Sequence, residues 1–107
     1  MLHLVTSSPG SRIREAIAQK KLVEIRYKGQ TRVVEPHDFG VQAGNERLLG
    51  YQLRSSRAAF GKDTVGWRLF DVIKIESIEI LDMPFKGSRA AARQDHYHWD
   101  HLYARVS

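Results

Sequence analysis

The sequence predicts a mainly β domain that begins with one short helix. After residue 22, apolar and polar side chains alternate in several short runs, which is the period of half-buried strands. Before that point, a single stretch has apolar residues at helical spacing. The chain of 107 residues has room for one domain with one small core.

The helix is expected over residues 12–21. Ser11 is a suitable N-cap, because its hydroxyl can accept a hydrogen bond from the first turn. Ile13, Ala16 and Ile17 fall at positions i, i+3 and i+4, so they form one narrow apolar face. We therefore expect this helix to pack against a sheet.

A β-hairpin is expected to follow the helix. Residues 23–27 alternate between apolar and charged side chains, and residues 28–30 form a tight connection around a glycine. The second strand is expected over residues 31–39. Pro36 has no amide donor, so it belongs at an edge, a bulge or a bend of that strand.

A third strand is expected over residues 47–54, after a turn at residues 44–45. Gly50 lies inside this strand, where glycine indicates a bend or a close approach of another segment. The polar residues 55–64 are interpreted as the longest loop of the domain.

The fourth and fifth strands are expected over residues 65–70 and 72–81. The apolar positions of the fifth strand change from odd to even between Ile75 and Ile78, which indicates a β-bulge. About five short strands with several bends predict a small, strongly bent sheet or barrel.

The carboxyl-terminal residues change in character. Residues 87–93 favour a helix, whereas the alternation over residues 102–106 fits a strand and the same residues also fit a helix. We therefore divide the chain into a lead segment (1–10), a β domain (11–85) and a carboxyl-terminal extension (86–107).

Composition limits the functional classes. The chain has no cysteine, which excludes a disulfide scaffold, a thiolate zinc site and a cysteine nucleophile. No apolar run is long enough to span a bilayer, and the first residues do not resemble a signal peptide. The expected location is the cytoplasm. The net charge of +5 favours anionic partners, but many basic proteins of this size bind no nucleic acid.

Basic residues on the strands are the candidate binding residues, since arginine and lysine contact phosphates without base specificity. The alternative is that these charges only solvate the outer face of the sheet. Trp67 and Tyr51 are interpreted as core residues. The candidates are Arg26, Lys28, Arg32, His37, Arg47, Arg54, Arg68 and Lys74.

Catalysis and metal binding have weak support in the sequence. His96, His98 and His101 could ligate a metal, but their spacing matches no established zinc signature. The favoured interpretation of these histidines is an exposed tail. Neither a phosphate-binding glycine loop nor a metalloprotease motif is present. We expect no cofactor, no catalytic residue and no enzymatic activity.

The order of these features resembles a free-standing WYL domain. Residues 14–27 (REAIAQKKLVEIRY) resemble the opening helix and strand of that family, residues 32–37 (RVVEPH) its second strand, and residues 70–78 (FDVIKIESI) its closing pattern. The resemblance covers roughly residues 13–85. It implies an Sm-like small β-barrel and a bacterial regulatory module that binds nucleotides or single-stranded nucleic acid.

The chain departs from the family pattern in its third strand and after the closing phenylalanine. Glu46, Arg47 and Leu48 stand where the namesake Trp-Tyr-Leu is expected. Asp71 replaces a basic residue and Ile73 an acidic one, so only Lys74 keeps the basic character there. The first functional hypothesis is a module that binds an anionic ligand, either a nucleotide or a single-stranded nucleic acid. The alternative, which the missing Trp-Tyr pair favours, is a protein-interaction or homodimerisation module that has lost the ligand site.

Overall fold

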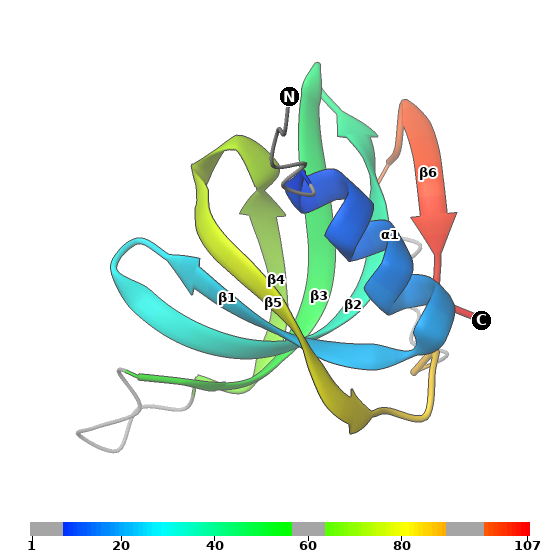
Figure 1. The fold of residues 1–107 in the computed structure, drawn as a ribbon. Coiled ribbons are helices and arrows are strands. Elements are labelled where there is room, and N and C mark those ends of the chain that lie inside the picture. The colour runs from blue at the N-terminus through cyan, green and yellow to red at the C-terminus, as the bar shows by residue number, and fades with distance from the viewer. Residues whose placement is uncertain (1–7, 57–63, 90–97) are drawn as a thin grey trace, which may run out of the picture.

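The computed structural model describes residues 8–56, 64–89 and 98–107. These residues form one α-helix, a short 3-10 helix and six strands (Figure 1). The elements are α1 (Pro9–Gln19), β1 (Lys21–Tyr27), β2 (Gln30–Gln42), β3 (Asn45–Ser55), β4 (Gly66–Asp71), η2 (Val72–Lys74), β5 (Ile75–Pro84) and β6 (His101–Arg105).

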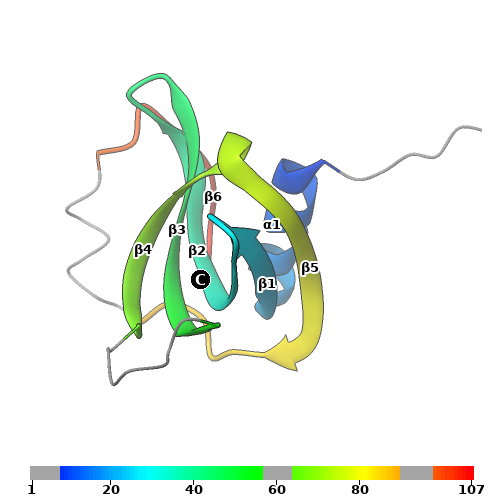
Figure 2. The same cartoon turned by 90° about the vertical axis from the view of Figure 1, so that its left-hand side faces the viewer.

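The strands form one antiparallel six-stranded sheet in the order β4-β3-β2-β1-β5. The long strand β2 organises it, because β3 pairs with β2 from Arg32 to Gln42. On its other edge, β2 pairs first with β1 and then, over Asp38–Val41, with β6. The sheet curls so strongly that β4 and β5 face each other across the molecule (Figure 2).

The predicted closed barrel is wrong. Among the described residues, no backbone pairing joins β4 to β5, so the curled sheet stays open. The chain passes from β4 to the opposite edge through η2, and residues 72–74 are therefore a 3-10 helix, not the predicted start of a strand. Where the chain leaves β4, the Asp71 amide donates to Tyr27 Oη at 3.0 Å and so links the end of β4 to β1.

The helix begins earlier than predicted. Ser8, not Ser11, is the N-cap, and its hydroxyl accepts a hydrogen bond from the Ser11 amide at 3.2 Å. Pro9 is the first helical residue, where its missing N–H and fixed φ are no disadvantage. The helix ends at Gln19, and its C-cap Lys20 adopts the left-handed conformation with φ 54°.

The predicted irregularities of the strands are confirmed. The β1–β2 turn has positive φ at Lys28 and Gly29, as a two-residue hairpin turn requires. The register of β2 against β3 shifts directly after Pro36. The register of β1 against β5 shifts between Arg26 and Tyr27, which pair with Ser77 and Ile75 of β5. A Cβ atom at Gly50 would collide with Val34, which explains the glycine inside β3.

The described part of the carboxyl-terminal extension contains a strand. Residues 101–105 form β6 and not a helix, because pairing with β2 satisfies their backbone groups. Most of the predicted loop at 55–64 and of the helix-favouring stretch at 87–93 lies outside the described residues.

The core lies between α1 and the inner face of the curled sheet. We call inner the face that carries Ile25, Val34 and Phe70, and outer the opposite face. The buried face of α1 is the predicted one, with Ile13, Ala16 and Ile17. Among the described residues, no helix is long and apolar enough to cross a membrane.

Candidate anion-binding site

Two of the predicted basic residues lie together on the inner face of the sheet. Each is two residues away along its strand from a core residue, Val34 in β2 and Phe70 in β4. Arg32 pairs with Ile25 of β1, and Arg68 pairs with Gly50 of β3. Gln52 occupies the inner face of β3 between them. We call Arg32 and Arg68 the arginine pair.

Arg32 is half-buried and rests on aromatic rings. Its guanidinium carbon lies 5.3 Å from the centre of the Tyr27 ring and 5.8 Å from that of Phe70. It donates to Gln52 Oε1 at 3.3 Å and to the Tyr27 carbonyl at 3.4 Å. Its buried Nε has no hydrogen-bond partner within the described residues. Arg32 is thus held in place by two hydrogen bonds and two aromatic rings.

Arg68 approaches the same place from β4. It donates to the carbonyls of Trp67 at 2.9 Å and Thr64 at 3.1 Å. Gln52 Nε2 also donates to the Thr64 carbonyl, at 2.6 Å, so the amide links the two arginines through one backbone group. Burial lowers the pKa of Arg32, and the nearby charge of Arg68 lowers it further.

The arginine pair therefore has excess positive charge. Throughout residues 8–56, 64–89 and 98–107, neither guanidinium forms an ion pair with a carboxylate. Like charges at close range destabilise each other, and a bound anion would remove that cost. The arrangement is chemically suited to a phosphate or carboxylate ligand.

The other predicted basic residues do not join the pair. Arg26 lies 3.3 Å from Glu76, and Arg47 lies 3.0 Å from Asp71, which Lys74 also approaches at 3.6 Å. Arg54 is exposed, and its pairing with Val33 places it on the outer face. Lys28 is exposed in the hairpin turn, 5.8 Å from the Tyr27 ring centre. The predicted basic residues therefore do not gather on one surface.

His37 is not at a surface, contrary to its place among the predicted binding residues. Its side chain is fully buried at the bulge of β2, 4.8 Å from the Trp67 ring and 5.7 Å from the Phe85 ring. Its Nε2 lies 3.4 Å from Glu35 Oε1. Burial lowers the pKa of His37, and the hydrogen bond to Glu35 opposes this only in part.

Lowering the pH from about 7 to about 5 is expected to destabilise the protein through His37. The unfolded residue binds a proton near its ordinary pKa of 6.5, whereas the folded residue binds it only at lower pH. The unfolded state thus binds more protons below 6.5, and stability falls by up to about 1.4 kcal/mol per pH unit until the folded pKa is passed.

Urea denaturation at several pH values checks this expectation. His37→Gln should flatten the pH dependence, whereas the exposed His101, changed to Gln, should leave it as in the wild type. An unchanged slope in His37→Gln would contradict the assignment.

The aromatic and histidine candidates lie elsewhere. Trp67 and Tyr51 are half-buried on the outer face, with ring centres 5.3 Å apart. His98 and His101 are exposed, and His96 lies outside the described residues. In the part of the chain that the structure describes, no group of three or more potential metal ligands occurs.

Sequence reasoning missed Gln52, which joins the two arginines. Gln52 is 2% exposed. Its spacing of two from Gly50 and four from Leu48 places this polar side chain on the same face of β3, and that spacing could have indicated a buried polar residue. It also missed that Glu35 and Asp38 are buried carboxylates. Each of these residues binds an arginine from the segment after residue 85.

Comparison with known proteins identifies the class of this domain. The sequence profile of the WYL domain matches residues 11–80, and the chain therefore belongs to the WYL domain family. WYL domains are ligand-binding regulatory modules without catalytic activity.

A solved structure supports the fold assignment. The chain is similar to proteasome accessory factor B/C (PafBC) of Arthrobacter aurescens, with a TM-score of 0.59 and 20% sequence identity. The match covers 86% of this chain and 15% of PafBC, so the chain corresponds to a small part of that protein. No curated protein matches the sequence.

Proposed function

We propose that this domain binds an anionic ligand, a nucleotide or a single-stranded nucleic acid, at the arginine pair. The observation that carries the proposal is the placement of Arg32 and Arg68 on one face without a carboxylate partner among the described residues. The net charge of +5 would favour the approach of such a ligand.

The chemistry of guanidinium groups suits phosphate. Each arginine presents planar N–H donors that can bind two phosphate oxygens at once, which lysine cannot do. Gln52 and the aromatic rings of Tyr27 and Phe70 would hold Arg32 in position, so that little side-chain entropy is lost on binding. The domain would sense its ligand and not transform it.

Arg68→Gln is expected to weaken binding of a labelled single-stranded oligonucleotide by about tenfold at low salt. It should also reduce the slope of log affinity against log salt concentration by about 1, because one phosphate contact is lost. Fluorescence anisotropy at two salt concentrations measures both quantities.

The matched control is Arg54→Gln, which removes the same charge from the exposed outer face. If both variants lose affinity equally, binding depends on net charge and not on the arginine pair. If neither variant differs from the wild type, the proposed site is wrong.

A protein-interaction or homodimerisation module is the second candidate. Ile73 on η2 favours it, since 91% of this large apolar residue is exposed. Light scattering distinguishes the two: a dimer that Ile73→Ser returns to the 12.3 kDa monomer would support this function. A wild-type monomer at all concentrations would count against homodimerisation.

A further inference from the structure

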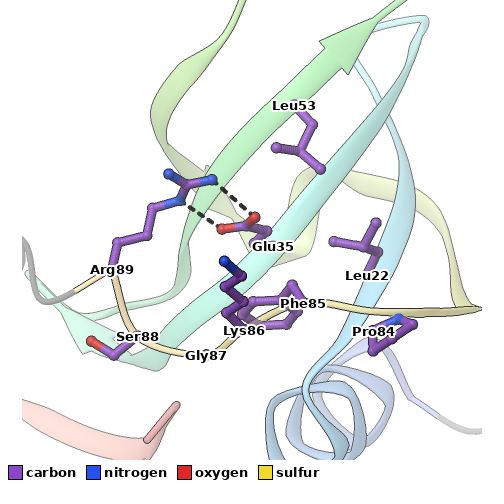
Figure 3. A pocket seen from close by; sticks show the side chains of 9 residues that line it. All are labelled: Leu22, Glu35, Leu53, Pro84, Phe85, Lys86, Gly87, Ser88 and Arg89. Atoms are coloured by element: carbon purple, nitrogen blue, oxygen red, sulfur yellow. Dashed lines mark hydrogen bonds and ion pairs between the residues drawn. The ribbon is translucent and has the colours of Figure 1, made fainter.

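The outer face of β2 carries a buried carboxylate that holds one arginine. The side chain of Glu35 is 10% exposed, and its oxygens accept from Arg89 Nε at 2.7 Å and Arg89 Nη2 at 3.0 Å. The same guanidinium lies 3.7 Å from the centre of the Tyr51 ring. The Arg89 side chain is 40% exposed, so solvent reaches it. Figure 3 shows its guanidinium paired with both oxygens of Glu35.

This arrangement has the parts of a receptor for guanidinium groups. A carboxylate that accepts two parallel N–H bonds and an aromatic face that covers the cation are the contacts by which proteins recognise guanidinium. A buried carboxylate without a cation would be costly, so the site requires an occupant. Arg89 supplies it, and the hydrogen bonds to Glu35 raise the pKa of Arg89.

A pocket adjoins the carboxylate. Its volume is about 550 Å³, within the range of small-molecule sites. Leu22, Leu53 and Phe85 give it an apolar side, and Lys86 and Arg89 also line it (Figure 3). The pocket therefore offers an apolar wall next to a site for a cation, and a lysine that can meet an anion.

We propose that Glu35 and Tyr51 form a binding site for guanidino acids, which Arg89 occupies within the free protein. The guanidinium of the ligand takes the place of Arg89 on Glu35 and Tyr51. Its aliphatic chain lies along Leu53 and Phe85, and its carboxylate faces Lys86. The site lies on the face opposite the arginine pair, and the proposal does not depend on anion binding there.

Displacement requires only the Arg89 side chain to leave Glu35, and that side chain is 40% exposed. Arg89 lies beyond residues 11–80, the part that matches the family, so the occupant comes from the flanking segment and the receptor from the sheet. A tethered side chain acts at an effective concentration in the millimolar range, against which a free ligand must compete. Removing the Arg89 side chain should therefore raise the affinity of the site for a free guanidino acid.

Arg89→Gln is the variant that tests the proposal, with L-arginine as the ligand and L-citrulline as its neutral isostere. Titration calorimetry should show L-arginine binding to Arg89→Gln at least about tenfold more tightly than to the wild type. L-Citrulline should not bind, because its urea group lacks the charge that Glu35 requires. Agmatine, which has no carboxylate to meet Lys86, should bind more weakly than L-arginine, and equal binding would contradict the placement of the carboxylate at Lys86.

Two further measurements keep the test decisive. Adding Glu35→Gln to Arg89→Gln should abolish L-arginine binding, and binding that persists would place the ligand elsewhere. If Arg89→Gln does not fold, the Nε–H resonance of Arg89 in the wild type should shift on titration with L-arginine and not with L-citrulline. Equal effects of the two compounds, or no effect of either, would overturn the proposal.

Discussion

Replacing Arg105 by methionine is expected to lower the free energy of unfolding by about 3–5 kcal/mol. The carboxylate of Asp38 is completely buried, and Arg105 donates to its two oxygens at 3.0 and 2.9 Å. Trp99 Nε1 donates to the same carboxylate at 3.2 Å, but an indole carries no positive charge. Without Arg105, the buried negative charge would lose this two-point ion pair.

Urea denaturation at neutral pH measures this loss directly. The matched control is Arg54→Met, which makes the same change at an exposed position and should alter stability by less than about 0.5 kcal/mol. A loss below about 1 kcal/mol in Arg105→Met would mean that the Asp38 site relaxes and that β6 contributes little to stability.

Gly40→Ala is expected to detach β6 from β2, at a cost of about 1–3 kcal/mol or more. A Cβ atom at Gly40 would collide with the backbone oxygen of His101, and would lie 3.0 Å from the Cα of Leu102. These are backbone atoms of the partner strand, so no side-chain rotation can relieve the contact.

Amide hydrogen exchange measures the detachment strand by strand. In Gly40→Ala, the amides of β6 should lose protection, whereas those of the β1–β2 hairpin should keep it, because they are paired at the other end of β2. Unchanged protection of β6 would show that the two strands can separate slightly without breaking.

The sequence predicted those parts of the fold that depend on local pattern. The spacing of Ile13, Ala16 and Ile17 identified the packed face of α1, and Pro36 and Gly50 marked the irregular points of the strands. Closure of the barrel could not be predicted, because it depends on pairing between strands that are distant in sequence. The open edge between β4 and β5 therefore appeared only in the structure.

The candidate site was predicted only in part for a related reason. A bulge changes which residues share a face, so the shift after Pro36 places both Glu35 and Asp38 on the outer side of β2. It also buries His37, which the sequence pattern had placed among the binding residues. Arg32 and Arg68 meet only because β2 and β4 both flank β3 in the sheet.

The two buried carboxylates give β2 a second role. Glu35 binds Arg89 and Asp38 binds Arg105, so β2 fixes two points of the segment that follows the matched residues 11–80. Both ion pairs lie on the outer face, whereas the arginine pair lies on the inner face. The domain thus uses one strand to position its carboxyl-terminal segment and its candidate ligand site.

An NMR titration that follows the arginine Nε–H resonances while a short oligothymidylate is added tests most directly whether the arginine pair binds anions. Binding at the pair should cause saturable shifts at Arg32 and Arg68, with Arg26 and Arg54 unchanged, and a weaker response at higher salt. Shifts confined to Arg26 and Arg54, or none at low salt, would contradict an anion site at the arginine pair.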